Sequence, residues 1–238
     1  MRFLGWDLSD PFARCPRPVD VAVLEATGPV RFEAWPWPPV DSRGGLGPEA
    51  LASAFPVGPE DLAVVDGPQA LALPGARVRE AERLLRAPGR TPDVLPLPGG
   101  PFQGFVRGSV LLFAALRGGQ GAAPLLDVDT PEPGQARLFE AFPGATWRRM
   151  AVEKLGRKGS PGGRAQRQAL LEAEGLRFAP GARPTHDQLD AALCAWLGRL
   201  TRTAPERLHA VGTPLWVDEA GALREGRILD LREPSLSR

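Results

Sequence analysis

The sequence contains no tyrosine and only two lysines, two cysteines and two histidines among 238 residues. The cysteines, Cys15 and Cys194, are too few for a disulfide framework. Together with the two histidines they also exclude a zinc site of the usual Cys/His kind. A signal peptide and a long apolar run are lacking, so we expect a cytoplasmic protein that does not span a membrane. The net charge of +1 argues neither for nor against a nucleic-acid partner.

Proline and glycine are abundant instead, with 27 and 28 residues. Proline is at about twice its usual share. Apolar segments nevertheless recur along the whole chain, which favours a folded protein with rigid loops over disorder. The length is sufficient for a sizeable core. We predict one domain over residues 1–238, with long Pro/Gly-rich loops.

The periodicity of apolar residues predicts alternating strands and helices. We expect strands at 2–8, 19–26, 30–37, 62–66 and 135–143, and a terminal hairpin of 215–218 with 227–229. We expect helices at 48–55, 75–87, 105–116, 145–155 and 166–174, and from 185 onward. Residues 88–104 and 121–134 are expected to be loops, and 156–164 to be a flexible basic loop.

The helix from Thr185 is the most informative segment. Thr185 and Gln188 form the capping-box pattern, and leucines recur along one face at helical spacing. Asp187 and Asp190 lie on the same side, and Asp is a poor residue for a helix interior. An ordinary alternative is a first-turn Asp that complements the helix dipole, followed by a tolerated surface Asp.

Two further aspartates lie in apolar strands. Asp7 belongs to the first strand, and Asp66 ends a buried strand that we expect to be parallel. Ligands of open α/β sheets lie at the carboxyl ends of such strands, although a strand-end Asp is also common in turns. Several acids without His or Cys suit Mg²⁺ or Mn²⁺. Two such ions can stabilise the attacking and leaving oxygens in phosphodiester hydrolysis.

Over most of its length the chain resembles the domain-of-unknown-function 429 family, predicted nucleases with the ribonuclease H-like fold. The resemblance is carried by residues 5–7, 64–68, 77–86, 140–143, 163–171 and 186–191. The last segment also resembles the D-x-x-D helix of Holliday-junction resolvases. The family usually has Arg, Cys and Asp close together in the 77–86 segment, whereas this chain has Arg77, Arg79 and Glu80.

The resemblance implies an α/β fold with a mixed central sheet, its first strand beside the Asp66 strand and helices on both faces. It also implies catalytic and metal-binding roles for Asp7, Asp66, Asp187 and Asp190. Glu140 would be a further metal ligand or would support its strand. The implied cofactor is Mg²⁺ or Mn²⁺.

Basic residues cluster between positions 148 and 167. As a substrate-binding surface they would neutralise backbone phosphates without reading sequence, although a charge run is also typical of a solvated face. The candidates are Arg148, Arg149, Lys154, Arg157, Lys158 and Arg164. Trp6 and Trp147 are candidates for base stacking, with core packing the simpler interpretation of Trp6.

Three functions therefore stay open. The first is a metal-dependent nuclease acting on RNA or DNA. The second is a non-catalytic ribonuclease H-like module that binds nucleic acid or protein. The third is another phosphoryl-transfer enzyme, which the lack of a G-x-x-x-x-G-K-[ST] loop disfavours.

Overall fold

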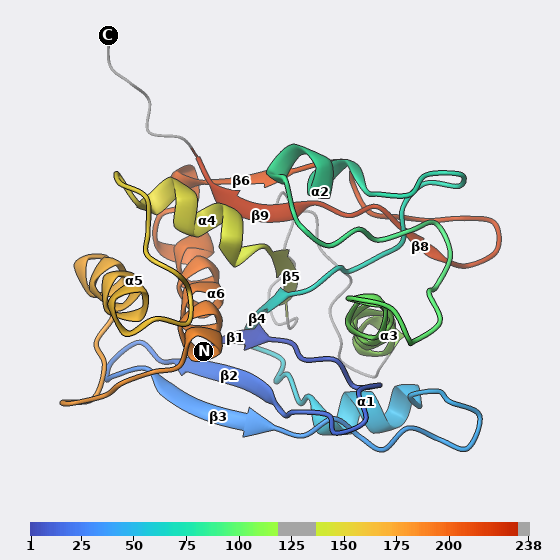
Figure 1. Ribbon diagram of the computed structural model, residues 1–238, viewed down its shortest axis with the longest axis horizontal. Helices are drawn as coiled ribbons and strands as arrows, with labels where there is room; N and C mark the ends of the chain where they lie inside the picture. Colours follow the sequence, from blue (N-terminus) through green and yellow to red (C-terminus); the bar gives the residue numbers. More distant parts are fainter. Residues whose placement is uncertain (119–136, 233–238) are drawn as a thin grey trace, which may run out of the picture.

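A mixed sheet of seven strands organises the computed structural model, which describes residues 1–118 and 137–232 (Figure 1). The strand order is β3-β2-β1-β4-β5-β9-β6. The strands of this sheet are β1 (Phe3–Asp7), β2 (Val19–Leu24), β3 (Arg31–Trp35), β4 (Leu62–Asp66), β5 (Arg137–Ala141), β6 (Leu208–Val211) and β9 (Ile228–Leu231). The helices are α1 (Pro48–Ala54), α2 (Glu80–Leu85), α3 (Gln103–Gly118), α4 (Pro143–Met150), α5 (Pro161–Ala173) and α6 (His186–Thr203), with a short 3-10 turn at Pro205–Arg207.

Alternating side chains of the central strands serve two separate cores. Phe3 and Val64 join the cluster around α6, whereas Leu4, Trp6 and Val65 join the cluster around α1 and α3. The helices accordingly lie on both faces, with α4, α5 and α6 on one side and α1 and α3 on the other (Figure 1). None of the helices in the described part of the chain is both long and apolar enough to cross a membrane.

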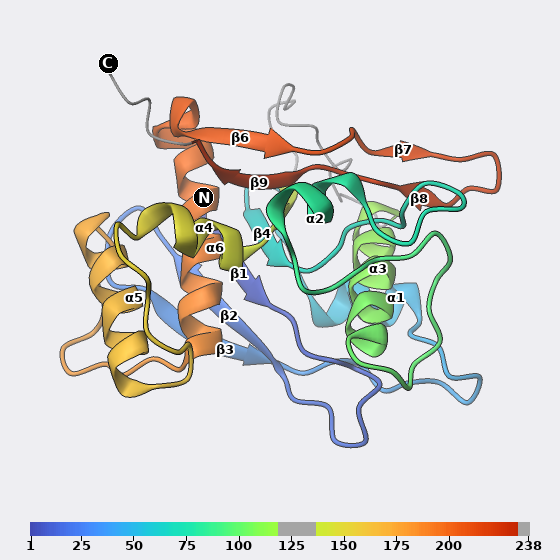
Figure 2. The same ribbon diagram turned by 45° about the horizontal axis from the view of Figure 1, so that its top comes forward.

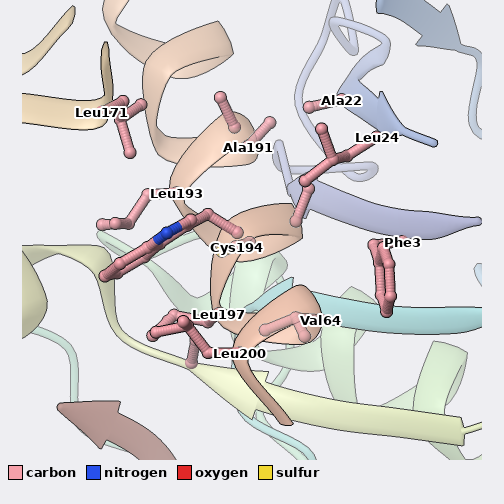
Figure 3. Packing of buried hydrophobic residues seen from close by; sticks show 14 of the residues in the cluster. Phe3, Ala22, Leu24, Val64, Leu171, Ala191, Leu193, Cys194, Leu197 and Leu200 are labelled. Carbon is pink, nitrogen blue, oxygen red and sulfur yellow. The ribbon is translucent and has the colours of Figure 1, made fainter. Parts of the chain in front are cut away.

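Helix α6 crosses β1 at unusually short range. A Cβ atom placed on Gly5 would lie 1.9 Å from the carbonyl oxygen of Ala191 and 2.3 Å from the amide nitrogen of Ala195. One turn further along, Gly198 lies close to the side chains of Leu62 and Val64 instead of to backbone atoms. Figure 3 shows α6 packed on the strand residues of this core. The missing side chain of Gly5 therefore allows the helix to lie directly on the strand.

Most predicted elements are confirmed, but two helices are shorter than predicted. The helix predicted over 75–87 begins only at Glu80, because Gly75 is left-handed (φ +82°) and Arg79 is extended. The helix predicted over 145–155 ends at Met150, where Ala151 becomes extended and the chain turns to pack Leu155 against the α6 core. The loop predicted over 121–134 lies outside the described residues.

The C-terminal prediction is wrong in its pairing. Residues 227–229 do not pair with 215–218; β9 lies between β5 and β6 in the main sheet. A small hairpin does form, between β7 (Trp216–Val217) and β8 (Leu223–Arg224), and Figure 2 shows it extending beyond β6 and β9. All four residues of β9 are buried, which is typical of a strand covered on both faces. A hairpin strand at the surface would have one exposed face.

The flexible loop predicted over 156–164 is also partly wrong. Pro161 begins α5, and the hydroxyl of Ser160 caps this helix by accepting from the amide of Gly163 at 3.1 Å. Proline at the first helical position and serine before it are a strong helix start. Residues 156–160 remain outside the helix, and Lys158 in this segment contacts Asp190.

Candidate functional site

Three carboxylates from distant parts of the chain meet at one point. Asp7 ends β1, Asp66 ends β4, and Asp190 lies in the second turn of α6. One oxygen of each lies within 4.8 Å of the others. Asp190 is fully buried, whereas Asp7 and Asp66 are half-buried and line a cavity. The sequence thus places three acids where a cation with oxygen ligands can bind.

The fold explains this convergence. Strands β1 and β4 are parallel neighbours, and Asp7 and Asp66 are directly paired in their register. Both carboxylates therefore leave the same end of the sheet on the same side. Asp190 directly precedes Ala191, whose carbonyl oxygen touches Gly5, so the close crossing of α6 brings Asp190 to the same end.

Burial and mutual repulsion disfavour the charged form of these acids. Desolvation, followed by the charges of Asp66, Asp190 and Asp187, raises the pKa of Asp7 well above its usual value. Desolvation and the charge of Asp190 raise the pKa of Asp66 to about 7. Burial also raises the pKa of Asp190, and the neighbouring Lys158 and Trp147 only partly oppose it. A divalent cation at this point would favour the charged form of all three acids and so lower the pKa of each.

Two side chains hold Asp190 in place. The indole N–H of Trp147 donates to Asp190 Oδ1 at 2.6 Å, and the Lys158 ammonium forms an ion pair with Asp190 Oδ2. Trp147 is only 3% exposed, so it cannot stack on a base as predicted. Trp6 is fully buried in the other core, in agreement with the simpler interpretation. The role of Trp147 was missed, because an isolated tryptophan gives no sequence signal for the acid that it contacts.

Asp187 is not among the three acids that lie within 4.8 Å of one another, although it still interacts with Asp7. Arg17 donates to Asp187 Oδ2 at 2.9 Å, and His186 Nε2 lies 3.0 Å from Oδ1. Burial acts to raise the pKa of Asp187, but the hydrogen bond from Arg17 and other favourable contacts outweigh it, and the pKa is lowered. Asp187 still lines the same cavity as Asp7 and Asp66. Arg17 lies in a Pro-rich turn and was not predicted to contribute.

Comparison with known proteins finds a family match for the part of the chain that includes α6 and its aspartates. The model of the family described as protein of unknown function (DUF429) matches residues 117–213. The resemblance to this family is confirmed. The matched segment contains Glu140, Asp187 and Asp190, whereas Asp7 and Asp66 lie outside it. No curated protein and no solved structure matches the chain.

Glu140, within the DUF429 match, is already bound by other protein groups. Its carboxylate accepts two hydrogen bonds from the guanidinium of Arg79, one of them at 2.7 Å, and one from the amide of Gln69 at 3.0 Å. Arg79 also donates to Glu82 at 3.1 Å, and Arg79 and Glu140 are almost completely buried. Burial raises the pKa of Glu140, and Arg79 opposes this only in part. The structure therefore does not bring Glu140 into the group of three. Residues 77–86, which depart from the family's usual pattern, have a structural role through Arg79.

The predicted basic residues separate into two groups. Arg148, Lys154 and Lys158 line a cavity of 810 Å³ that also contains Asp66 and Asp190, together with Arg86 and Arg167, which were not predicted. Arg149 instead donates to the buried Asp230 at 2.6 Å. Arg157 and Arg164 do not line this cavity. A basic hollow thus adjoins the acids, built from a different set of residues than predicted.

The repulsion among the acids predicts a pH dependence of stability. The pKa of Asp66 is raised from 3.8 to about 7 in the folded protein. Between these values the folded state binds more protons than the unfolded state. The contribution of Asp66 to the free energy of unfolding is therefore fully present below pH about 4 and is lost as the pH rises through 7. We expect the metal-free Asp66→Asn variant to lose less stability than wild type between pH 4.5 and 7.5, by on the order of 2 kcal/mol. Urea unfolding with EDTA at each pH measures this difference.

The matched control is Glu153→Gln, which removes an exposed carboxylate of the neighbouring basic cavity. It should leave the pH dependence as it is in wild type. Equal slopes for wild type and Asp66→Asn would contradict a raised pKa at Asp66. Asp190→Asn is less suitable here, because it would also disturb the contacts with Trp147 and Lys158.

Proposed function

We propose that this protein is a metal-dependent nuclease of the ribonuclease H-like fold, which hydrolyses phosphodiester bonds at the carboxylates of Asp7, Asp66 and Asp190. The observation that carries the proposal is the approach of these three carboxylates within 4.8 Å, at the end of two paired parallel strands. Like charges so close together are unfavourable unless protons or a cation intervene.

The sheet supports the fold part of the proposal. Strands β1, β2 and β3 are antiparallel neighbours, and β1, β4 and β5 are parallel neighbours. The first strand therefore lies beside the Asp66 strand, as the family resemblance implies for a ribonuclease H-like sheet. The helices on both faces agree with the same arrangement.

The residues fit Mg²⁺ or Mn²⁺ better than a softer metal. All three candidate ligands are carboxylates, which such hard cations prefer. Within residues 1–118 and 137–232, neither Asp7 nor Asp66 forms an ion pair with a basic side chain. Asp7, Asp66 and Asp190 would hold the metal, and Asp187, which lines the same cavity and is paired with Arg17, would support them from beside Asp7. Ions held there would supply Lewis-acid activation of water and of the phosphate.

The chain's own residues would position the substrate. The cavity beside Asp66 and Asp190 presents cations to the phosphates on either side of the reacting one. Burial acts to lower the pKa of Lys158, but the charges of Asp190, Asp7 and Asp66 outweigh it and raise the pKa, so this side chain stays positive. The lysine therefore presents a positive charge both to Asp190 and to the cavity that would hold the phosphates.

Purified wild-type protein provides the direct test. We expect Mn²⁺ or Mg²⁺ to stabilise it by about 2.7 kcal/mol at about one hundred times the Kd, because metal binds only the folded site. We also expect metal-dependent cleavage of at least one of single-stranded, duplex and branched substrates, as RNA or DNA. Thermal melting measures the first effect, and gel electrophoresis of end-labelled substrates measures the second.

One observation favours the non-catalytic module as the second candidate. Lys158 already neutralises Asp190 without any metal, as a purely structural ion pair would. Protein that binds nucleic acid but cuts none of the three substrates, with no shift in melting on adding metal, would establish that alternative. Protein that neither binds nor cuts would end the nucleic-acid proposal.

A further inference from the structure

A second hollow also reaches the aspartates, and its lining has a different character. Its volume is 390 Å³, within the range of small-molecule sites. Asp7, Asp66 and Lys158 line one part of it, and three aromatic side chains line another. These are Phe102, Phe105 and Phe142.

Phe102 has two unfavourable properties, a strained backbone and the exposure of an aromatic residue to solvent. Its backbone is left-handed, with φ of +63°, which is a strained conformation for a bulky residue. The residue is also 55% exposed, and no ring or cation stacks on it within the described part of the chain. A glycine would be the ordinary residue at such a position. An exposed aromatic residue on a strained backbone, lining a cavity, indicates a binding role.

Several polar groups that line this hollow are already bound to one another, as Arg17 is to Asp187. Arg79 is bound to Glu140 and Glu82, and Glu82 also accepts from the amide of Thr91 at 2.9 Å. A ligand would therefore be held mainly by stacking on Phe102, since the Phe142 ring already has the Arg148 guanidinium over it, with little hydrogen-bond recognition of its edges. Sequence-tolerant binding of bases has this character.

The two hollows share the residues at which the reaction is proposed. Asp66, Phe142 and Lys158 line both of them. One hollow offers cations, as a phosphodiester chain requires, and the other offers aromatic rings, as a base requires. A nucleotide whose base entered the aromatic hollow would have its phosphate beside Asp66 and Lys158.

We propose that the hollow lined by Phe102, Phe105 and Phe142 binds an unpaired base of a single-stranded nucleic acid, next to the phosphate held at the aspartates. This inference rests on the proposed function for the place of the reacting phosphate, and on the hollow itself for the choice of substrate. A paired base is unsuitable, because its faces are covered by the neighbouring pairs. Single-stranded substrates should accordingly be preferred over duplexes, with little dependence on base identity.

Three substitutions at Phe102 test this inference. Phe102→Gly should raise Tm by about 2–4 °C, because it removes the strain. It should weaken binding of a fluorescent single-stranded oligonucleotide by about 5- to 150-fold, the range expected for loss of one stacked base. Phe102→Leu should weaken binding without raising Tm, since the strain remains. Phe102→Trp should bind within about twofold of wild type, since its ring can stack.

Fluorescence anisotropy in EDTA measures binding without cleavage, with RNA and DNA strands and the matched blunt duplex as separate arms. Unchanged affinity of Phe102→Gly for single strands, or stronger binding of wild type to the duplex, would overturn the inference. Wild type that binds no single strand at all would overturn it as well. Melting with Mn²⁺ is followed in parallel. If metal gives no shift and nothing is cut, the proposed function fails, whereas the Phe102 series still decides the base-binding hollow.

Discussion

Asp7→Asn should reduce metal-dependent cleavage by about a thousandfold or more, since loss of roughly 4 kcal/mol of transition-state stabilisation has this effect. Asp7 is paired with Asp66 in the strand register, and one of its oxygens lies within 4.8 Å of both Asp66 and Asp190, so its carboxylate contributes to the whole group of three. The amide keeps the shape of the side chain but lacks the charge that a cation requires. Single-turnover cleavage of the preferred substrate, at saturating Mn²⁺, measures the effect.

The same substitution should not destabilise the metal-free protein. Burial and the neighbouring acids raise the pKa of Asp7 well above its usual value, so the charged form is unfavourable in the fold. Removal of that charge should leave the free energy of unfolding at pH 7 equal or higher. Binding of nucleic acid in EDTA should stay close to that of wild type, because the basic cavity is unchanged.

Glu49→Gln is the matched control for cleavage, since it removes an exposed carboxylate at the start of α1, outside both hollows. It should retain nearly full cleavage. An Asp7→Asn protein that is folded, binds substrate and cuts at the wild-type rate would remove Asp7 from the reaction. A variant that loses metal stabilisation and cleavage together, but keeps binding, is the result that the proposal requires.

A substitution of Lys158 in the basic segment does not test phosphate binding alone. Lys158 contacts Asp190, so its removal would change metal affinity as well as phosphate binding. Arg148 and Lys154 line the same cavity and are not among the side chains paired with the three aspartates. They are therefore the better choice for separating phosphate contacts from metal contacts.

The sequence was sufficient for the parts of the site that follow from regular secondary structure. Asp7 and Asp66 end apolar strands, and the family resemblance implied that these two strands are neighbours, so that their ends lie together. The capping box at Thr185 set the start of α6, and its apolar stripe set the face that packs on the sheet. Periodicity and capping are local properties, so they can be read without the fold.

The remaining parts depend on contacts that have no local pattern. Arg17 and Asp187 are 170 positions apart, and Trp147 and Asp190 are 43 apart. Glu140 illustrates the same limit, since its strand position alone could not show that Arg79 would neutralise it. Strand β9 is too short to reveal by its pattern which distant strand it joins. Long-range side-chain pairing thus decides which of the predicted acids remain available to a cation.

The close contact between Gly5 and α6 predicts the largest loss of stability. In Gly5→Ala the new methyl group would lie 1.9 Å and 2.3 Å from backbone atoms of Ala191 and Ala195, which cannot turn away as a side chain can. The helix would have to move off the sheet, and we expect a loss of about 3 kcal/mol or more in the free energy of unfolding. Urea denaturation at pH 7, followed by circular dichroism, measures this loss.

Two other glycines provide a graded comparison. Gly198→Ala would press mainly on the Leu62 and Val64 side chains, which can adjust, so its loss should be smaller than that of Gly5→Ala. Gly162→Ala lies in α5 with open space around it, and it should be neutral or stabilising by about 0.5–1 kcal/mol. Because Asp190 adjoins Ala191, Gly5→Ala should also lose the stabilisation by Mn²⁺, even where enough protein stays folded to be measured. A Gly5→Ala protein with wild-type stability and an intact Mn²⁺ shift would show that α6 does not depend on this contact. The position of Asp190 beside Asp7 and Asp66 would then need another cause.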